Sequence, residues 1–136
     1  MAAIIIDSGP LVALIDEAEE HHAWSKESLT HIQSPLLTCE AALSEACFLL
    51  ASVHQAYSHL TVLIEKGIVV PVSMGGFHLQ IFDFMEKYHS VPMSFADACL
   101  VCMVENNPGS TLFTLDRHFT IYRQQRRRLI PLIAPF

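Results

Sequence analysis

The sequence is poor in charge and contains no long uncharged apolar run. Asp, Glu, Lys and Arg make up 16% of its 136 residues, whereas 51% are hydrophobic. No stretch approaches the roughly 18 apolar residues that cross a bilayer. Asp7 interrupts the apolar N-terminal run, and no basic segment precedes that run, so a secretory signal is not expected. We therefore expect a cytoplasmic protein with no membrane segment, whose apolar surplus fills a large core or an extra interface such as that of a homodimer.

The usual sets of soft metal ligands are also missing. None of the eight histidines belongs to an H-E-x-x-H motif. Cys99 and Cys102 form a C-x-x-C, but no second pair stands at the spacing of a zinc site. With Cys39 and Cys47 they are expected to be small, buried, reduced thiols, and a metal or redox role is the alternative.

Positive charge is scarce and concentrated. Eight basic residues face fourteen acidic ones, and the net charge of −6 argues against broad, non-specific binding of nucleic acid. Five of the basic residues lie between Arg117 and Arg128. The run that includes Arg126 and Arg127 is either a solvated segment before the last strand or, together with Arg117, a contact for a phosphate backbone.

Short β-rich runs alternate with helical stretches along the chain. The pattern predicts strands at residues 3–6, 35–38, 68–72, 111–115 and 129–133. It predicts a helix started by Ser8-Gly9-Pro10, and further helices at 21–31, 40–51, 55–66, 77–88 and 94–105. Strands separated by helices indicate an α/β fold, a three-layer sandwich with a central parallel sheet, as a single domain over residues 1–136.

Four acids occupy positions that suggest one shared site. Asp7 and Asp116 follow the first and fourth predicted strands, and sites in such folds form outside the carboxyl ends of the strands. Glu45 and Asp97 lie in predicted helices. Their neighbours at helical spacing are mostly apolar, so both acids are expected on inward faces.

Each acid also has a purely local explanation. Asp7 could cap the first helix, Asp97 could form a reciprocal cap with Ser94, and Asp116 could open a turn with Arg117. Glu45 could pair with an arginine, and Glu40 suits the helix dipole as a cap or an outer group. These explanations do not account for four acids placed at one end of one sheet.

Carboxylates gathered in a dry pocket repel one another and raise each other's pKa values. A hard divalent ion such as Mg²⁺ or Mn²⁺ relieves this repulsion and prefers oxygen ligands. Such an ion lowers the pKa of a bound water and stabilises charge on a phosphate. The acids therefore predict phosphoryl chemistry with water as the nucleophile.

Four motifs, in order and over nearly the whole chain, resemble those of the PIN-domain ribonucleases, especially the small VapC-type toxins of toxin–antitoxin pairs. They are residues 4–11 (IIIDSGPL), 38–45 (TCEAALSE), 92–98 (PMSFADA) and 112–119 (LFTLDRHF). In one respect the chain departs from some members, because His118 stands where they carry a second acid, two residues after the fourth acid Asp116.

The resemblance implies a Mg²⁺- or Mn²⁺-dependent endoribonuclease acting on RNA, frequent homodimers, and a small antitoxin protein that occupies the site. Asp7, Glu45, Asp97 and Asp116 would be its catalytic metal ligands, and Ser8 and Thr114 would support them. Arg117, Arg126 and Arg127 could hold the RNA backbone. One alternative is a catalytically inactive PIN-like binding module. A phosphatase of the haloacid-dehalogenase kind is disfavoured because Asp7-Ser8-Gly9 lacks the D-x-D pattern.

Overall fold

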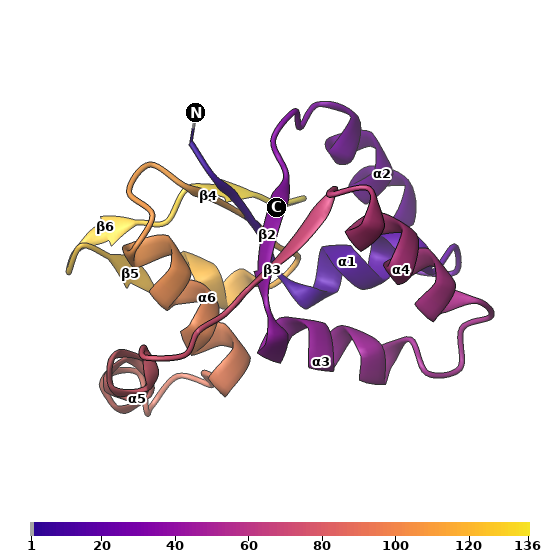
Figure 1. Cartoon of the computed structure of the whole chain (residues 1–136). Coiled ribbons are helices and arrows are strands. Elements are labelled where there is room, and N and C mark those ends of the chain that lie inside the picture. The colour runs from indigo at the N-terminus through magenta and orange to yellow at the C-terminus, as the bar shows by residue number, and fades with distance from the viewer. Residues whose placement is uncertain (1) are drawn as a thin grey trace.

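A five-stranded sheet, parallel throughout, forms the centre of the molecule (Figure 1). The computed structural model describes residues 2–136, so Met1, which the predicted domain includes, lies outside the described residues. The strand order is β3-β2-β1-β4-β7. The strands are β1 (Ile4–Ile6), β2 (Leu36–Cys39), β3 (Val69–Val72), β4 (Thr111–Phe113) and β7 (Leu132–Ile133). The predicted three-layer α/β fold is confirmed.

Six α-helices connect and cover the strands, close to the predicted positions. They are α1 (Ser8–Ile15), α2 (His22–Thr30), α3 (Glu40–Leu49), α4 (Ala56–Glu65), α5 (His78–Lys87) and α6 (Phe95–Glu105). Gly67, with a φ of 70°, follows the end of α4 in the left-handed conformation that glycine tolerates best. Within the described residues no helix is long and apolar enough to span a membrane.

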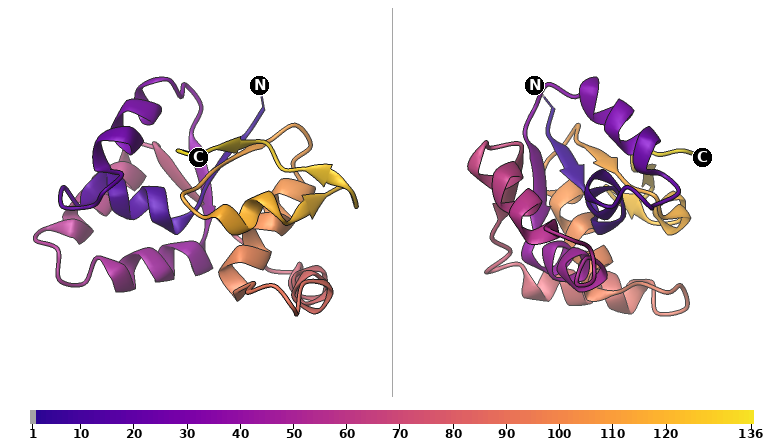
Figure 2. Two further views of the ribbon diagram at one scale, coloured as in Figure 1. Left: turned by 180° about the vertical axis from the view of Figure 1, so that it is seen from behind. Right: turned by 90° about the vertical axis from the view of Figure 1, so that its right-hand side faces the viewer.

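The two faces of the sheet bury separate apolar clusters, because successive strand residues point to opposite faces. Ile5 and Leu112 pack in the cluster that contains α6, whereas Ile6 and Phe113 pack with α1 and α4. Figures 1 and 2 show α5 and α6 on one side of the sheet and α1, α2 and α4 on the other. Helix α3 begins directly after β2 and contacts both α1 and α6, so it lies at the carboxyl end of the sheet.

The C-terminal prediction was partly wrong. The expected strand at 129–133 is divided at Ile130 and Pro131, and only β7 joins the sheet. Proline lacks an N–H and cannot continue a hydrogen-bonded ladder, although the Pro131 carbonyl still accepts from the Leu112 N–H at 2.9 Å. The preceding residues form a small antiparallel hairpin of β5 (Arg123–Gln124) and β6 (Arg128–Leu129), which the sequence pattern did not predict.

The four cysteines are free thiols, as predicted, and three of them are buried while Cys47 is partly exposed. Cys102 donates to Oε1 of Gln80 at 3.3 Å, so it has a partner on α5. Burial raises the pKa of Cys39 and of Cys102, and that of Cys99 to about 12. These three thiols stay protonated at neutral pH, which disfavours the redox alternative.

Candidate active site

The register between β1 and β4 places Asp7 beside Thr114. Ile6 is paired with Phe113, and the Asp7 N–H donates to the Phe113 carbonyl at 3.0 Å. The next residue of each strand therefore emerges at the same edge, where Thr114 Oγ1 donates to Asp7 Oδ2 at 2.8 Å. The strand order reverses direction between β1 and β4, and such a switch point is the usual position of a site in an open α/β sheet.

Asp7 is the most buried of the four acids, with 5% of its surface exposed. It is the N-cap of α1 and accepts the Ser8 N–H at 2.7 Å, so its predicted capping role is confirmed. Burial raises the pKa of the Asp7 carboxyl to about 6, although the hydrogen bonds from Thr114 and Ser8 lower it. The negative charges of Asp97 and Asp116 raise that pKa further, so the three acids share one electrostatic field.

Glu45 reaches the same place from α3. Ser8 Oγ donates to Glu45 Oε2 at 3.1 Å and also lies 3.4 Å from Asp7 Oδ1, so one hydroxyl links two of the acids. The prediction of an inward face for Glu45 was wrong in part, because its neighbours Phe48 and Leu49 are 81% and 56% exposed. Apolar residues at helical spacing mark a face suited to burial, but they do not tell a core face from an exposed one.

Asp97 combines its predicted local role with a place in the site. Its N–H donates to Ser94 Oγ at 3.0 Å, and the Ser94 N–H donates to Asp97 Oδ2 at 3.3 Å, which forms the expected capping box. Burial raises the pKa of the Asp97 carboxyl, and the charges of Asp116 and Glu45 raise it further. The cap therefore does not isolate Asp97 from the other acids.

Asp116 follows β4 and begins the 3₁₀ helix η1 (Arg117–Thr120). Its Oδ1 accepts the backbone N–H of His118 at 2.9 Å and lies 2.8 Å from Nδ1 of the same residue. Its own N–H donates to Thr114 Oγ1 at 3.0 Å. The predicted turn is present, but its partner is His118 and not Arg117. The Thr114 hydroxyl therefore links the Asp7 carboxylate to the backbone N–H of Asp116.

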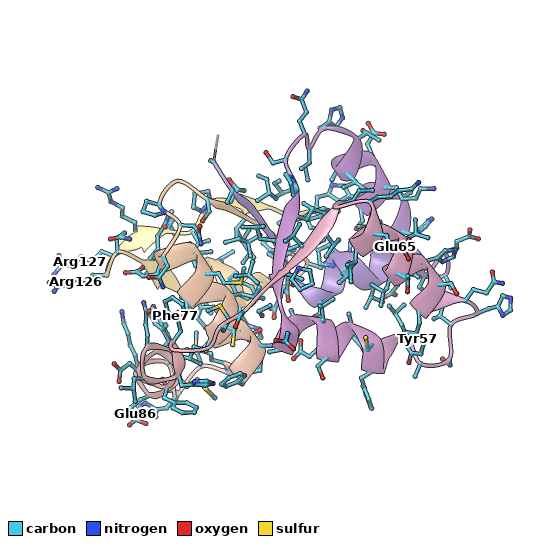
Figure 3. The ribbon with its side chains drawn as sticks, viewed as in Figure 1. Tyr57, Glu65, Phe77, Glu86, Arg126 and Arg127 are labelled. Carbon is cyan, nitrogen blue, oxygen red and sulfur yellow. The ribbon has the colours of Figure 1, made fainter. Side chains whose placement is uncertain are left out.

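All four acids line one cleft of about 730 Å³. Ser8 and Arg117 also line it, and Thr114 lies beneath it as a buried link. Arg126 and Arg127 do not line the cleft: they are exposed at the tip of the β5–β6 hairpin and extend from the edge of the molecule (Figure 3). The structure thus brings together the acids and Arg117, but not the other two predicted arginines.

The donor chemistry of this cleft suits a hard divalent cation. The four carboxylates and two hydroxyls are oxygen ligands of the kind that Mg²⁺ and Mn²⁺ prefer. In residues 2–136, however, no three His, Cys, Asp or Glu side chains are gathered closely enough to hold a metal. Asp97 and Asp116 are held by local donors at Ser94 and His118. The acids would therefore have to move closer together to bind an ion.

Two residues beside the acids were missed or left without a role by sequence reasoning. Tyr122 is fully buried, its hydroxyl donates to the Pro92 carbonyl at 2.6 Å, and it lies 3.4 Å from Asp97 Oδ2. Burial and the charge of Asp97 raise the Tyr122 pKa, so the phenol stays a neutral donor. No local pattern could reveal this contact, because 25 residues separate the partners. His118 was noticed only as a departure from the family motif.

Changing Thr114 to valine tests the link between Asp7 and Asp116. The variant leaves a buried carboxylate oxygen and an N–H without their partner, so we expect the free energy of unfolding to fall by about 2 kcal/mol in urea titrations. Thr38→Val is the matched control, because Thr38 is also buried and donates to the Ile6 carbonyl at 3.0 Å. Only the Thr114 variant should also weaken Mn²⁺ binding. Equal Mn²⁺ affinities in the two variants would contradict a role for Thr114 in the site.

Comparison with known proteins gives a consistent pattern. Residues 4–124 match the model of the PIN domain family. The chain is 29% identical over 124 residues to ribonuclease VapC26 of Mycobacterium tuberculosis, and the match covers 88% of this chain and 92% of the relative. The fold of this chain is similar to the crystal structure of M. tuberculosis VapC20, a toxin that cleaves the sarcin-ricin loop. The TM-score is 0.71 at 17% identity, over 84% of this chain and 90% of the other.

Proposed function

The chain belongs to the PIN domain family, and we propose that it is a Mg²⁺- or Mn²⁺-dependent endoribonuclease that hydrolyses RNA phosphodiesters. The observation that carries this proposal is the convergence of Asp7, Glu45, Asp97 and Asp116 on one cleft at the tips of β1 and β4. The relative named ribonuclease VapC26 supports the same reaction class. We also infer that residues 1–136 are one PIN domain.

The four acids are proposed to bind the ion through their carboxylate oxygens. They come from the ends of β1 and β4 and from helices α3 and α6. When bound, the ion would activate a water and neutralise charge on the phosphate. Ser8 keeps Asp7 and Glu45 together, and Thr114 orients Asp7 against Asp116. We infer that Glu45 or Asp97 accepts the proton of the attacking water, and the raised pKa of the Asp97 carboxyl supports that role.

The RNA backbone is proposed to contact Arg117, which lines the cleft and is exposed to solvent. The Arg117 guanidinium lies 4.6 Å from the centre of the Phe136 ring, and this cation–π contact orients it. Arg126 and Arg127 lie on the hairpin outside the cleft, where they could hold RNA only beyond the scissile phosphate.

A toxin of a toxin–antitoxin pair is the biological role that the similarity to VapC26 and VapC20 favours. In that role the chain would act in the cytoplasm, form a homodimer, and bind a small antitoxin protein. The exposed Phe48 and Leu49 line a second hollow that shares Glu45 with the cleft, and they support contact with a protein partner.

A non-catalytic binding module with the same fold is the second candidate. The observation that favours it is the local satisfaction of Asp97 by Ser94 and of Asp116 by His118. Such a module needs no ion, so Mn²⁺ should leave its melting temperature unchanged and no RNA should be cleaved.

The proposal is tested by comparing Glu45→Gln with Glu40→Gln. Both acids lie on α3, but only Glu45 lines the cleft. We expect Glu45→Gln to reduce Mn²⁺-dependent cleavage of a fluorescent RNA by about 100-fold or more, since it removes a charged ligand, whereas Glu40→Gln should cleave like the unaltered protein. EDTA should abolish cleavage in both. Equal activity of the two variants, or cleavage in EDTA, would overturn the four-carboxylate site.

A further inference from the structure

The β5–β6 hairpin carries three adjacent arginines, Arg126, Arg127 and Arg128, in a protein whose net charge is −6. All three are exposed, and in the part of the chain that the structure describes none of them forms an ion pair. Figure 3 shows Arg126 and Arg127 at the edge of the molecule. Arg123 differs from them, because its guanidinium donates to the Thr120 carbonyl at 2.6 Å. Arg123 therefore supports the base of the hairpin, and the three arginines beyond it are available to an anion.

The turn of this hairpin has an unusual backbone that a neighbouring helix holds in place. Gln125 and Arg126 have φ angles of 46° and 73°, in the left-handed region that residues other than glycine rarely adopt. Such conformations persist only where surrounding contacts hold them. Glu105, the last residue of α6, accepts the Gln125 N–H on Oε2 at 2.7 Å, and the Gln125 side chain donates to the Glu105 carbonyl at 3.3 Å. The contact with Glu105 therefore fixes the turn, and with it the position of the arginines.

The hairpin lies apart from the cleft but follows it directly along the chain. Arg117 lines the cleft, and residues 117–128 lead from it through η1 to the hairpin. Asp97 lines the cleft near the start of α6, and Glu105 follows it eight residues later, which corresponds to about 12 Å along the helix axis. A stacked strand carries one phosphate per roughly 3.4 Å, so a backbone that reaches from the cleft to the hairpin spans roughly four phosphates or more.

We propose that the β5–β6 hairpin is a preformed anchor for the RNA backbone, which it binds at least about four nucleotides to one side of the scissile phosphate. Glu105 is the positioning residue of this anchor. The inference rests on the proposed nuclease function and adds a substrate class to it, an RNA long enough to reach from the metal site to the hairpin. Backbone contacts of this kind supply affinity and orientation without reading the sequence.

An acidic protein surface is the competing partner for such a group of arginines. The continuity of the basic segment with Arg117 favours RNA, because a strand bound at the cleft already carries negative charge past η1. Other lysines offer no second path beside it, since Lys26 belongs to α2 and Lys66 follows α4, on the opposite side of the sheet from α6 (Figure 1). The hairpin therefore determines the side on which a bound strand leaves the cleft.

The test measures binding of a fluorescein-labelled single-stranded RNA of about 20 nucleotides, longer than the span estimated above. Fluorescence anisotropy in EDTA gives the dissociation constant without any need for cleavage. Arg126→Gln/Arg127→Gln removes two positive charges from the hairpin. Lys26→Gln/Lys66→Gln is the matched control, because it removes two positive charges from exposed side chains elsewhere on the surface.

The arginine variant should bind the RNA about tenfold more weakly. Its plot of log affinity against log salt should be shallower by about 1.4, since about 0.7 is lost with each phosphate contact to a single strand. The lysine variant should differ from the unaltered protein by less than about twofold, because salt screens charges more than about 10 Å apart. In Mn²⁺ the arginine change should raise the KM for cleavage with little effect on kcat, as expected when binding common to substrate and transition state is lost.

A second pair of variants tests the positioning role of Glu105. Glu105→Ala and Glu105→Gln both remove one negative charge, but only glutamine keeps a side-chain oxygen that can accept the Gln125 N–H. Glu105→Ala should therefore bind the RNA about threefold more weakly than Glu105→Gln, and thermal melts should show both variants folded. Equal affinities of these two variants would reject Glu105 as a positioning residue.

The outcomes separate this inference from the proposed function. Equal RNA affinities of the arginine and lysine variants would overturn the anchor and point to a protein partner for the hairpin. Failure of the unaltered protein to bind the RNA at low salt would also overturn it. Cleavage in Mn²⁺ with the same KM for the arginine variant and the unaltered protein would reject the anchor and leave the carboxylate site standing. Loss of RNA binding in the arginine variant, without cleavage by any of the proteins, would support the anchor and reject the nuclease.

Discussion

Replacing Asp7 with asparagine should reduce metal-dependent RNA cleavage by about 1,000-fold or more while the fold is retained. Asp7 is the buried acid at the switch point of the sheet, and its carboxylate is linked to Thr114 and, through Ser8, to Glu45. Loss of its charge weakens both the hold on the ion and the stabilisation of the transition state. A loss of this size corresponds to about 4 kcal/mol, as expected for the removal of a ligand of a catalytic ion.

Asparagine is the informative substitution because it keeps the shape of aspartate and is an equally good N-cap for α1. Circular dichroism and a thermal melt should therefore show a folded protein. Asp83→Asn is the control, since Asp83 is exposed on α5 and does not line the cleft. The cleavage rate of the Asp83 variant should match that of the unaltered chain. Retention of activity by a folded Asp7→Asn variant would reject the proposed nuclease site.

The ionisation of Asp7 should destabilise the metal-free protein as the pH rises from about 4 to about 7. Burial raises the pKa of this carboxyl from 3.8 to about 6, so the folded state favours the protonated form. The favourable contribution is fully present below 3.8, is lost between 3.8 and about 6, and is absent above that range. Each tenfold change in an acid dissociation constant corresponds to about 1.4 kcal/mol, so the loss is on the order of 3 kcal/mol.

Urea unfolding in EDTA at several pH values measures this effect, with Asp7→Asn as the reference. Asparagine does not titrate, and most other ionisable groups contribute equally to both proteins. The free energy of unfolding of the unaltered protein should therefore fall relative to the variant by on the order of 3 kcal/mol between pH 4 and pH 7. Mn²⁺ added at pH 7 should restore much of the loss, because a cation compensates the buried charge. Parallel pH profiles would show that Asp7 does not make this contribution.

Local patterns were sufficient for the order of the elements before the C-terminal hairpin and for selecting four acids that line one cleft. Residues 4–6 form a strand buried on both faces, which is why an uninterrupted isoleucine run predicted it. Ser94 and Asp97 formed the reciprocal cap that their spacing indicated, because a cap depends only on residues within one helical turn. Asp7 and Asp116 were located at strand ends for the same reason, since a strand and its end are both visible in a short window.

Local sequence patterns could not predict contacts between segments that are distant in the chain. The exposure of Phe48 beside Glu45 depends on which helices cover α3, and the spacing of apolar residues is the same for a covered and an uncovered face. The hydrogen bonds from Tyr122 toward Asp97 and from Thr114 to Asp7 join residues far apart in the chain. The sequence left two interpretations open for Arg126 and Arg127, a solvated segment or a contact for RNA. Their position outside the cleft follows from the β5–β6 hairpin, which the sequence pattern did not predict.

The sequence by itself predicted the alternation of strands and helices and the four acids that line the cleft. It also predicted that Asp7 and Asp116 follow the ends of two strands. Only the tertiary structure decided that Thr114 and Ser8 connect those acids. Parallel pairing of β1 with β4 sets the register at which Asp7 and Thr114 meet, and the position of α3 brings Glu45 to Ser8. Periodicity in the sequence reports on the conformation of a few neighbouring residues. A site depends on distances between residues far apart in the chain, and only the folded structure fixes those distances.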